Sequence, residues 1–267
     1  RIKICCFGSY RLKSDLKEAE KMPQKSQSVE RRKLEEEVES LRTRLSEMAG
    51  AKLTKDNPFI TDLSDPNRPT KLGEHYSELY SNEWTDVFQR RSDKKKKPEK
   101  DIIKNLLDIL IEGFEYCKKI KDLQNSGLQD IIFFPARDKA QRQVKDAEVN
   151  INEIFARHLT EAIKLSGDMT SEDVAKAFIQ KKDFRKKLGI VDGNVNYAIK
   201  CVKLCWLMLI QTPPVFIELS AKGDDPFDRE IYREYTKKGS KIDFIVWPPL
   251  RLHENGPLLL KGVAQGK

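Results

Sequence analysis

Two cysteines near the C-terminal end have the spacing of a metal-binding pair. Cys201 and Cys205 are four residues apart, so a helix would place both thiols on one face. Structural zinc sites need four such ligands. The run from Cys201 to Ile210 is the most apolar of the sequence, and no C-x-x-C or H-E-x-x-H motif accompanies it. We therefore expect buried structural cysteines, with no metal and no cofactor.

A second group could carry acid–base chemistry. His253 and Glu254 are adjacent, and Asp243 lies ten residues before the histidine. The other histidines, His75 and His158, are far away in the sequence. No nucleophile elbow or phosphate-binding glycine loop supports the group. We expect no catalytic residues and no enzyme, and a hydrolase using His253 and Glu254 is the alternative.

Three basic clusters carry more information than either group. The chain has a formal net charge of +8 and a pI of about 9.1. Any one cluster is typical of a solvated surface, but three in one chain favour an anionic partner. Charge alone does not choose the partner, and one candidate is an anionic phospholipid surface, bound peripherally. The alternative is a module that binds nucleic acid or an acidic protein, although nucleic acid is not expected without an RNP, zinc-finger or helix-turn-helix signature. The clusters contain Lys94, Lys95, Lys96, Lys97, Lys181, Lys182, Arg185, Lys186, Lys187, Lys237 and Lys238.

The composition is compatible with a chain in a reducing compartment. Its five cysteines are an odd number and do not resemble a disulfide framework. The sequence opens on Arg1 rather than Met, which is compatible with a fragment, and no secretory signal is expected at its start. The longest apolar run is about half of what a transmembrane helix needs, so no transmembrane helix is expected.

A heptad pattern before residue 50 predicts a coiled coil. Its apolar residues are spaced four and three apart alternately, as the a and d positions require. A solvated single helix is the alternative, because the pattern covers little more than two heptads. We expect a homo-oligomer formed through this seam, whose residues are Leu34, Val38, Leu41, Leu45 and Met48.

A proline-rich linker divides the chain into two predicted domains. Residues 1–55 form the coiled-coil segment, and residues 56–267 form a helical bundle of about five helices with a small C-terminal β element. The fold class is therefore mainly α. Residues 195–211 are apolar on nearly all sides, which is typical of a helix in the centre of a bundle.

Three other segments give specific expectations for the helices. The first helix should turn one face inward, with Trp84 and Phe88 beside it; that face contains Leu72, Tyr76, Leu79, Tyr80, Glu83 and Val87. The second helix, from Asp101, should end near Asn125–Gly127. Thr170–Asp173 should cap the N-terminus of a helix that continues to Lys186.

The apolar C-terminal stretch is predicted to close the domain. Pro248 and Pro249 should end a strand after Trp247, and the turn Asn255–Pro257 should return the chain as a second strand. Asn tolerates the left-handed backbone that such a turn requires. We expect Phe244, Val246 and Leu259 to pack against the helix at residues 195–211.

Two motifs at opposite ends of this domain carry a family resemblance. They are RPTKLGEHYSELYSNEWTDVF at residues 68–88 and IDFIVWPPLRLHENGPLLLKGVAQG at residues 242–266. Both resemble the C-terminal domain of the mitochondria-eating protein (Mieap) family, over roughly residues 57–266. Pro249 and Asn255 depart from the family pattern. The signature residues are Trp84, Trp247, Pro248, His253, Gly256 and Pro257.

The resemblance implies a non-enzymatic adaptor of mitochondrial quality control that associates with mitochondrial lipid. We then expect the basic clusters to bind an anionic phospholipid such as cardiolipin. The resemblance also implies a coiled coil before the domain, and a cytoplasmic and mitochondrial location, at the outer membrane or in the matrix. Protein partners are not indicated by any residue of this sequence.

Overall fold

Helical patterns of apolar residues fill the sequence after Pro66, and the computed structural model forms helices at most of them. The structure describes residues 32–34, 37–44, 65–93, 98–133 and 153–267. Two compact units, Arg1–Asp65 and Pro66–Lys267, make up the chain. The predicted domain boundary near residue 56 lies outside the described residues.

The second unit begins with one continuous helical run. It consists of α2 (Pro69–Leu79), the π-helical turn η1 (Tyr80–Trp84) and α3 (Thr85–Ser92). The helices that follow are α4 (Glu99–Phe133), α5 (Glu153–Leu165), α6 (Gly167–Gln180), α7 (Lys182–Leu188) and α8 (Val195–Leu209).

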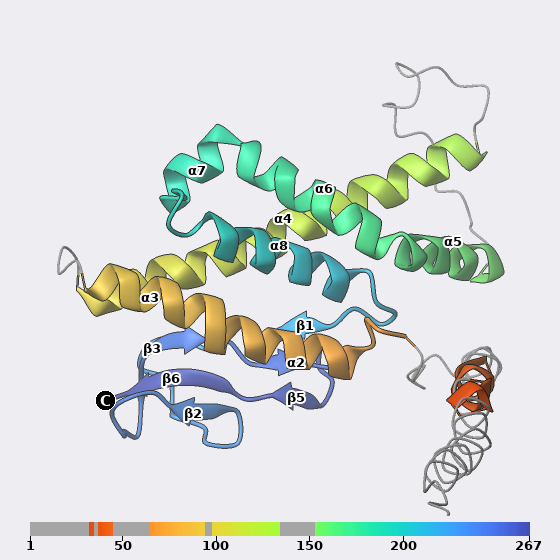
Figure 1. The fold of residues 1–267 in the computed structure, drawn as a ribbon. Coiled ribbons are helices and arrows are strands. Elements are labelled where there is room, and N and C mark those ends of the chain that lie inside the picture. The colour runs from red at the N-terminus through yellow and green to blue at the C-terminus, as the bar shows by residue number, and fades with distance from the viewer. Residues whose placement is uncertain (1–31, 35–36, 45–64, 94–97, 134–152) are drawn as a thin grey trace, which may run out of the picture. The chain divides into compact units, whose positions relative to one another are not determined.

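The helix α8 lies at the centre of the bundle. It contacts α6, α4 and α2, and Figure 1 shows it between α6 and the run from α2 to α3. Nine of its fifteen residues are buried, among them Trp206, whose indole N–H donates to the hydroxyl of Thr170 in α6 at 2.9 Å. A helix that is apolar on all sides is stable only when other elements surround it. The prediction of a central helix is confirmed.

The run from Pro69 to Ser92 changes pitch at its centre. Leu72, Tyr76 and Leu79 are buried at α-helical spacing, but the next buried residue, Trp84, comes five positions after Leu79. The π-helical turn absorbs this additional residue and keeps Trp84 on the buried face. The predicted inward face is therefore partly wrong, because Trp84 takes the buried position and Glu83 forms an ion pair with Lys200 of α8.

Three predicted helix boundaries are also wrong. The helix expected to continue to Lys186 ends at Gln180, and α7 begins at Lys182 after the extended residue Lys181. The helix α4 continues through Asn125, Ser126 and Gly127 to Phe133, whose ring contacts Phe155 of α5 with centroids 5.0 Å apart. A single glycine in a helix costs only about 1 kcal/mol, so tertiary contacts can override it. The helix α6 begins at Gly167, not at a Thr170 cap, and the hydroxyl of Thr170 donates back to the carbonyl of Ser166.

The C-terminal part forms two three-stranded sheets. One has the order β1 (Phe216–Ile217), β4 (Leu250–Arg251), β5 (Leu258–Leu260), and all its pairs are antiparallel. The other has the order β2 (Tyr232–Glu234), β6 (Gly262–Gly266), β3 (Ile242–Trp247). In it, β6 is parallel to β2 and antiparallel to β3. The predicted class, a helical bundle with a small C-terminal β element, is confirmed.

The sheets join the bundle through aromatic side chains and close contacts. Trp247 is 3% exposed, and its ring lies 4.7 Å from Tyr76 and 5.3 Å from Tyr80. The hydroxyl of Tyr76 donates to the carbonyl of Pro248 at 3.0 Å. The stretch therefore closes the domain as predicted, but its main contacts are with α2 and α4, and the predicted packing of Phe244 and Leu259 against α8 is wrong. Leu259 lies against Gly73 of α2, and Phe244 lies under Lys100 of α4.

Candidate functional site

Cys201 and Cys205 are buried, as predicted. Cys117, Cys201 and Cys205 are fully buried and free of disulfides. Burial raises the pKa of each thiol well above its usual range, which disfavours the thiolate that a metal would need. Across the ranges that the structure describes, no group of three or more His, Cys, Asp or Glu side chains could hold a metal ion.

The residues of the acid–base hypothesis have other contacts. Asp243 lies on β3, where its carboxylate accepts from Lys100 at 2.8 Å. His253 lies in the turn between β4 and β5 of the other sheet, and its Nδ1 is 2.9 Å from the carbonyl oxygen of Glu254. These contacts indicate structural roles for Asp243 and His253.

Local contacts fix the turn that contains His253. Asn255 has a φ of 60°, the left-handed conformation that its position was predicted to require. A Cβ on Gly256 would lie 2.7 Å from the ring of His253, so the imidazole packs over a position that admits no side chain. Arg251 donates to the carbonyl of Gly256 at 2.9 Å and forms an ion pair with Glu218 at 2.6 Å.

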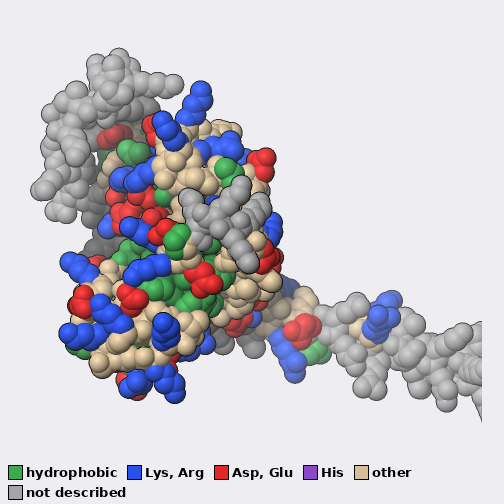
Figure 2. Space-filling model, turned by 90° about the vertical axis from the view of Figure 1, so that its left-hand side faces the viewer, with side chains coloured by type: hydrophobic (Ala, Val, Ile, Leu, Met, Phe, Trp, Pro, Cys, Tyr) green, Lys and Arg blue, Asp and Glu red, His purple; other side chains and the backbone are tan. Residues whose placement is uncertain are grey.

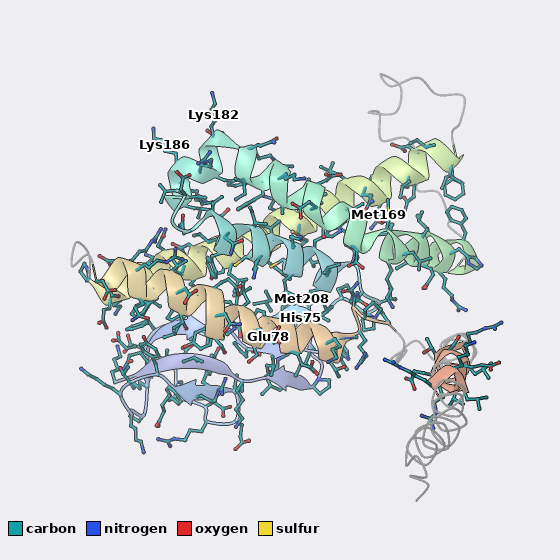
Figure 3. All side chains as sticks on the ribbon, in the orientation of Figure 1. His75, Glu78, Met169, Lys182, Lys186 and Met208 are labelled. Atoms are coloured by element: carbon teal, nitrogen blue, oxygen red, sulfur yellow. The ribbon has the colours of Figure 1, made fainter. Side chains whose placement is uncertain are left out.

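The helix α7 presents a group of cations to solvent. Lys182, Arg185 and Lys186 are exposed, and no ion-pair partner of theirs is found among the described residues. Figure 3 shows Lys182 and Lys186 pointing away from the domain. Lys181 instead lies over the ring of Tyr116 at 4.7 Å, and Lys187 forms an ion pair with Glu112 of α4. Three charges of this cluster are thus available to an anion.

Polar contacts fix α7 against the neighbouring helices. Arg91 of α3 donates to Asn105 of α4 at 2.6 Å, and Asn105 donates to the carbonyl of Leu188 at 2.8 Å. The helix ends at Gly189, whose φ of 58° is a left-handed C-cap. The end of α3 and the first turns of α4 therefore lie beside the C-terminal end of α7.

The third basic cluster lies in the loop between β2 and β3. The carbonyl of Lys237 accepts from the N–H of Gly266, and Lys241 exchanges two backbone hydrogen bonds with Lys267. The side chains of Lys237, Lys238 and Lys241 are exposed. The loop backbone is thus fixed on β6 while its lysines face solvent.

These clusters lie at one end of the domain. The Lys100–Asp243 ion pair joins the start of α4 to β3, directly after the loop that carries Lys237–Lys241. Viewed from this end, Figure 2 shows two groups of Lys and Arg side chains, above and below, with acidic and hydrophobic side chains between them. We call this region, with α7 and residues 237–241, the basic end.

Lys94–Lys97 lie outside the described residues. The flanking helices are described, and α3 ends and α4 begins at the basic end. Residues that the sequence did not single out hold this end together, above all Asn105, Glu112 and Lys100. Their contacts join positions 75 to 143 residues apart, and no local pattern indicates such pairs.

In the first unit, the predicted seam is only partly described. Residues 32–34 and 37–44 are helical, and Leu34, Val38 and Leu41 are about half exposed, at 56%, 46% and 54%. Leu45 and Met48 lie outside the described residues. Self-association through this seam remains a prediction.

None of the helices in the described ranges is both long and apolar enough to cross a membrane. Comparison with the curated proteins and with the solved structures finds no match. A family model described as mitochondria-eating protein matches residues 68–266, which is three quarters of the chain and includes both motifs. The chain therefore belongs to the mitochondria-eating protein family.

Proposed function

We propose that this protein is a self-associating adaptor that binds anionic mitochondrial phospholipid, such as cardiolipin, through its basic end. Membership of the mitochondria-eating protein family indicates a role in mitochondrial quality control, and this is not a known enzyme family. Lipid binding and self-association are our additions to that role.

The observation that carries the proposal is the position of the cations. Lys182, Arg185 and Lys186 on α7 and the lysines of residues 237–241 belong to segments that are about fifty residues apart in sequence. The contacts of α3, α4 and β3 bring both segments to one end of the domain. The two groups lie above and below in Figure 2, so an extended anionic surface that covers this end would meet both, whereas a small ligand could occupy only one.

The charges are sufficient for weak, salt-sensitive attachment. Each basic residue near an anionic bilayer contributes about 1 kcal/mol, and the effect decays within a Debye length of about 8 Å at physiological ionic strength. Self-association would raise the avidity of such weak sites.

Co-sedimentation of the full chain with vesicles tests this proposal. We expect binding to cardiolipin-containing vesicles, little binding to neutral phosphatidylcholine vesicles, and loss of binding as salt rises. Substitution of Lys182→Glu with Lys186→Glu should weaken binding by about 10- to 1000-fold, because two attractions of about 1 kcal/mol each become repulsions.

A matched variant carries the same charge change elsewhere. Lys118→Glu with Lys119→Glu alters two exposed lysines well along α4 and should bind almost as the unchanged protein does. Equal binding to neutral and cardiolipin vesicles, or equal loss in both variants, would contradict the proposal. A parallel arm with duplex DNA tests the alternative, since DNA binding without vesicle binding would favour a nucleic-acid module.

A further inference from the structure

The N-terminal segment joins the second unit at the end opposite the basic end. Asn67, just before α2, donates from its side-chain amide to the carboxylate of Asp168 in the first turn of α6 at 3.0 Å. The chain therefore enters beside the N-terminus of α6, whereas α7 follows the C-terminus of α6. Figure 1 shows α2 beginning at one side of the domain and α3 ending at the other.

The separation follows from helix geometry. The run from Pro69 to Ser92 is helical throughout, so at 1.5 Å per residue it covers about 35 Å. It starts at the point where the N-terminal segment joins and ends with Ser92 at the basic end. The distance is several times the Debye length of about 8 Å, so a membrane at the basic end would hardly influence the attachment point electrostatically.

We propose that this protein bridges two anionic membrane surfaces, a conclusion that rests on the proposed lipid binding and self-association. The basic end of one copy contacts one surface. Its N-terminal segment leaves from the far side of the domain and pairs through the seam with a second copy on another surface.

Two observations support pairing between surfaces. The described seam residues Leu34, Val38 and Leu41 are exposed within the single chain, and their heptad spacing makes the seam complementary to a second copy of itself. Because the segment joins the domain away from the cations, a membrane bound at the basic end leaves the attachment point unobstructed.

A vesicle-clustering assay tests the inference with the full chain. Vesicles of phosphatidylcholine and cardiolipin, labelled with either a donor or an acceptor dye, are mixed with protein, and energy transfer between them is measured. Co-sedimentation in the same samples reports binding. We expect vesicle binding together with clustering. Clustering should disappear when free protein in excess occupies the seams of the vesicle-bound copies, and also when salt releases the protein from the vesicles.

A seam variant separates bridging from binding. Leu34→Asp with Leu41→Asp should keep vesicle binding at high protein concentration but lose energy transfer to the level of vesicles alone. Ser40→Asp with Thr43→Asp places the same charges on the same helix outside the seam and should preserve clustering.

Each outcome decides between the proposals. Binding of the full chain without clustering, or clustering that the seam variant retains, would overturn bridging and leave the lipid-binding proposal intact. Absence of binding in the same samples would overturn both proposals. Clustering that depends on both the seam and Lys182 with Lys186 supports bridging.

Discussion

Trp247 connects the C-terminal sheet to the helical bundle through its aromatic contacts. Its ring lies against Tyr76 and Tyr80, and the next residue, Pro248, accepts a hydrogen bond from Tyr76. Burial raises the pKa of Tyr80 to about 12, so this tyrosine is neutral at every physiological pH. The contacts of Trp247 are therefore with neutral aromatic rings.

Replacing Trp247 with Ala should lower the free energy of unfolding by about 3–5 kcal/mol, because it removes a fully buried ring and leaves a cavity. Chemical denaturation followed by circular dichroism measures the change. Trp247→Phe is the control that keeps most of the packing and removes a buried indole N–H without a partner among the described atoms. It should cost clearly less than Ala, and equal costs would show that packing is not the cause.

Several single-residue features of this domain could be predicted from sequence. The two prolines, the Asn255–Pro257 turn and the burial of Cys201 and Cys205 follow from local composition. The ion pair of Asp243 with Lys100 could not be predicted, because its partners are 143 positions apart and both are ordinary surface residues in sequence.

The strand β6 lies so close to its neighbours that side-chain size decides its fit. At Gly262, a Cβ would lie 2.8 Å from the backbone nitrogen of Pro249 and from the carbonyl oxygen of Trp247. Both are backbone atoms in a proline-stiffened segment, so neither can move cheaply. The glycine is thus required where β6 passes the end of β3.

We predict that Gly262→Ala destabilises the domain by about 1–3 kcal/mol through overpacking. Gly193→Ala is the matched control, because its Cβ would meet no atom within 4 Å, and its effect should stay within about 0.5 kcal/mol. Urea titrations of both variants give the comparison. If Gly262→Ala left the free energy of unfolding unchanged, β3 and β6 would be less closely packed than these distances indicate.

Helix positions could be predicted better than helix boundaries. Periodicity located α2, α4 and α8, since each has a long apolar face. It could not reveal the π-helical turn at Tyr80–Trp84, because the five-residue step between buried positions has meaning only when the core is known. Periodicity also predicted an end of α4 that is too early. The low helix propensity of Asn125–Gly127 is outweighed by contacts of the helix with the rest of the bundle.

The two ends of the second unit, Pro66–Lys267, expose different kinds of side chain. The cations of α7 and residues 237–241 gather at the basic end, while exposed apolar side chains such as Leu165 and Met169 lie where α5 meets α6. The sequence predicted the clusters but not their convergence, which depends on how α3, α4, α7 and β3 pack. Which end meets a membrane is therefore the central question.

Hydrogen exchange of the full chain with and without cardiolipin vesicles answers it most directly, because amide protection reports which segments a bound surface covers. We predict slower exchange on binding in residues 182–188 and 236–241, with no change in residues 153–169. Protection confined to residues 153–169, with α7 unchanged in the bound state, would contradict it.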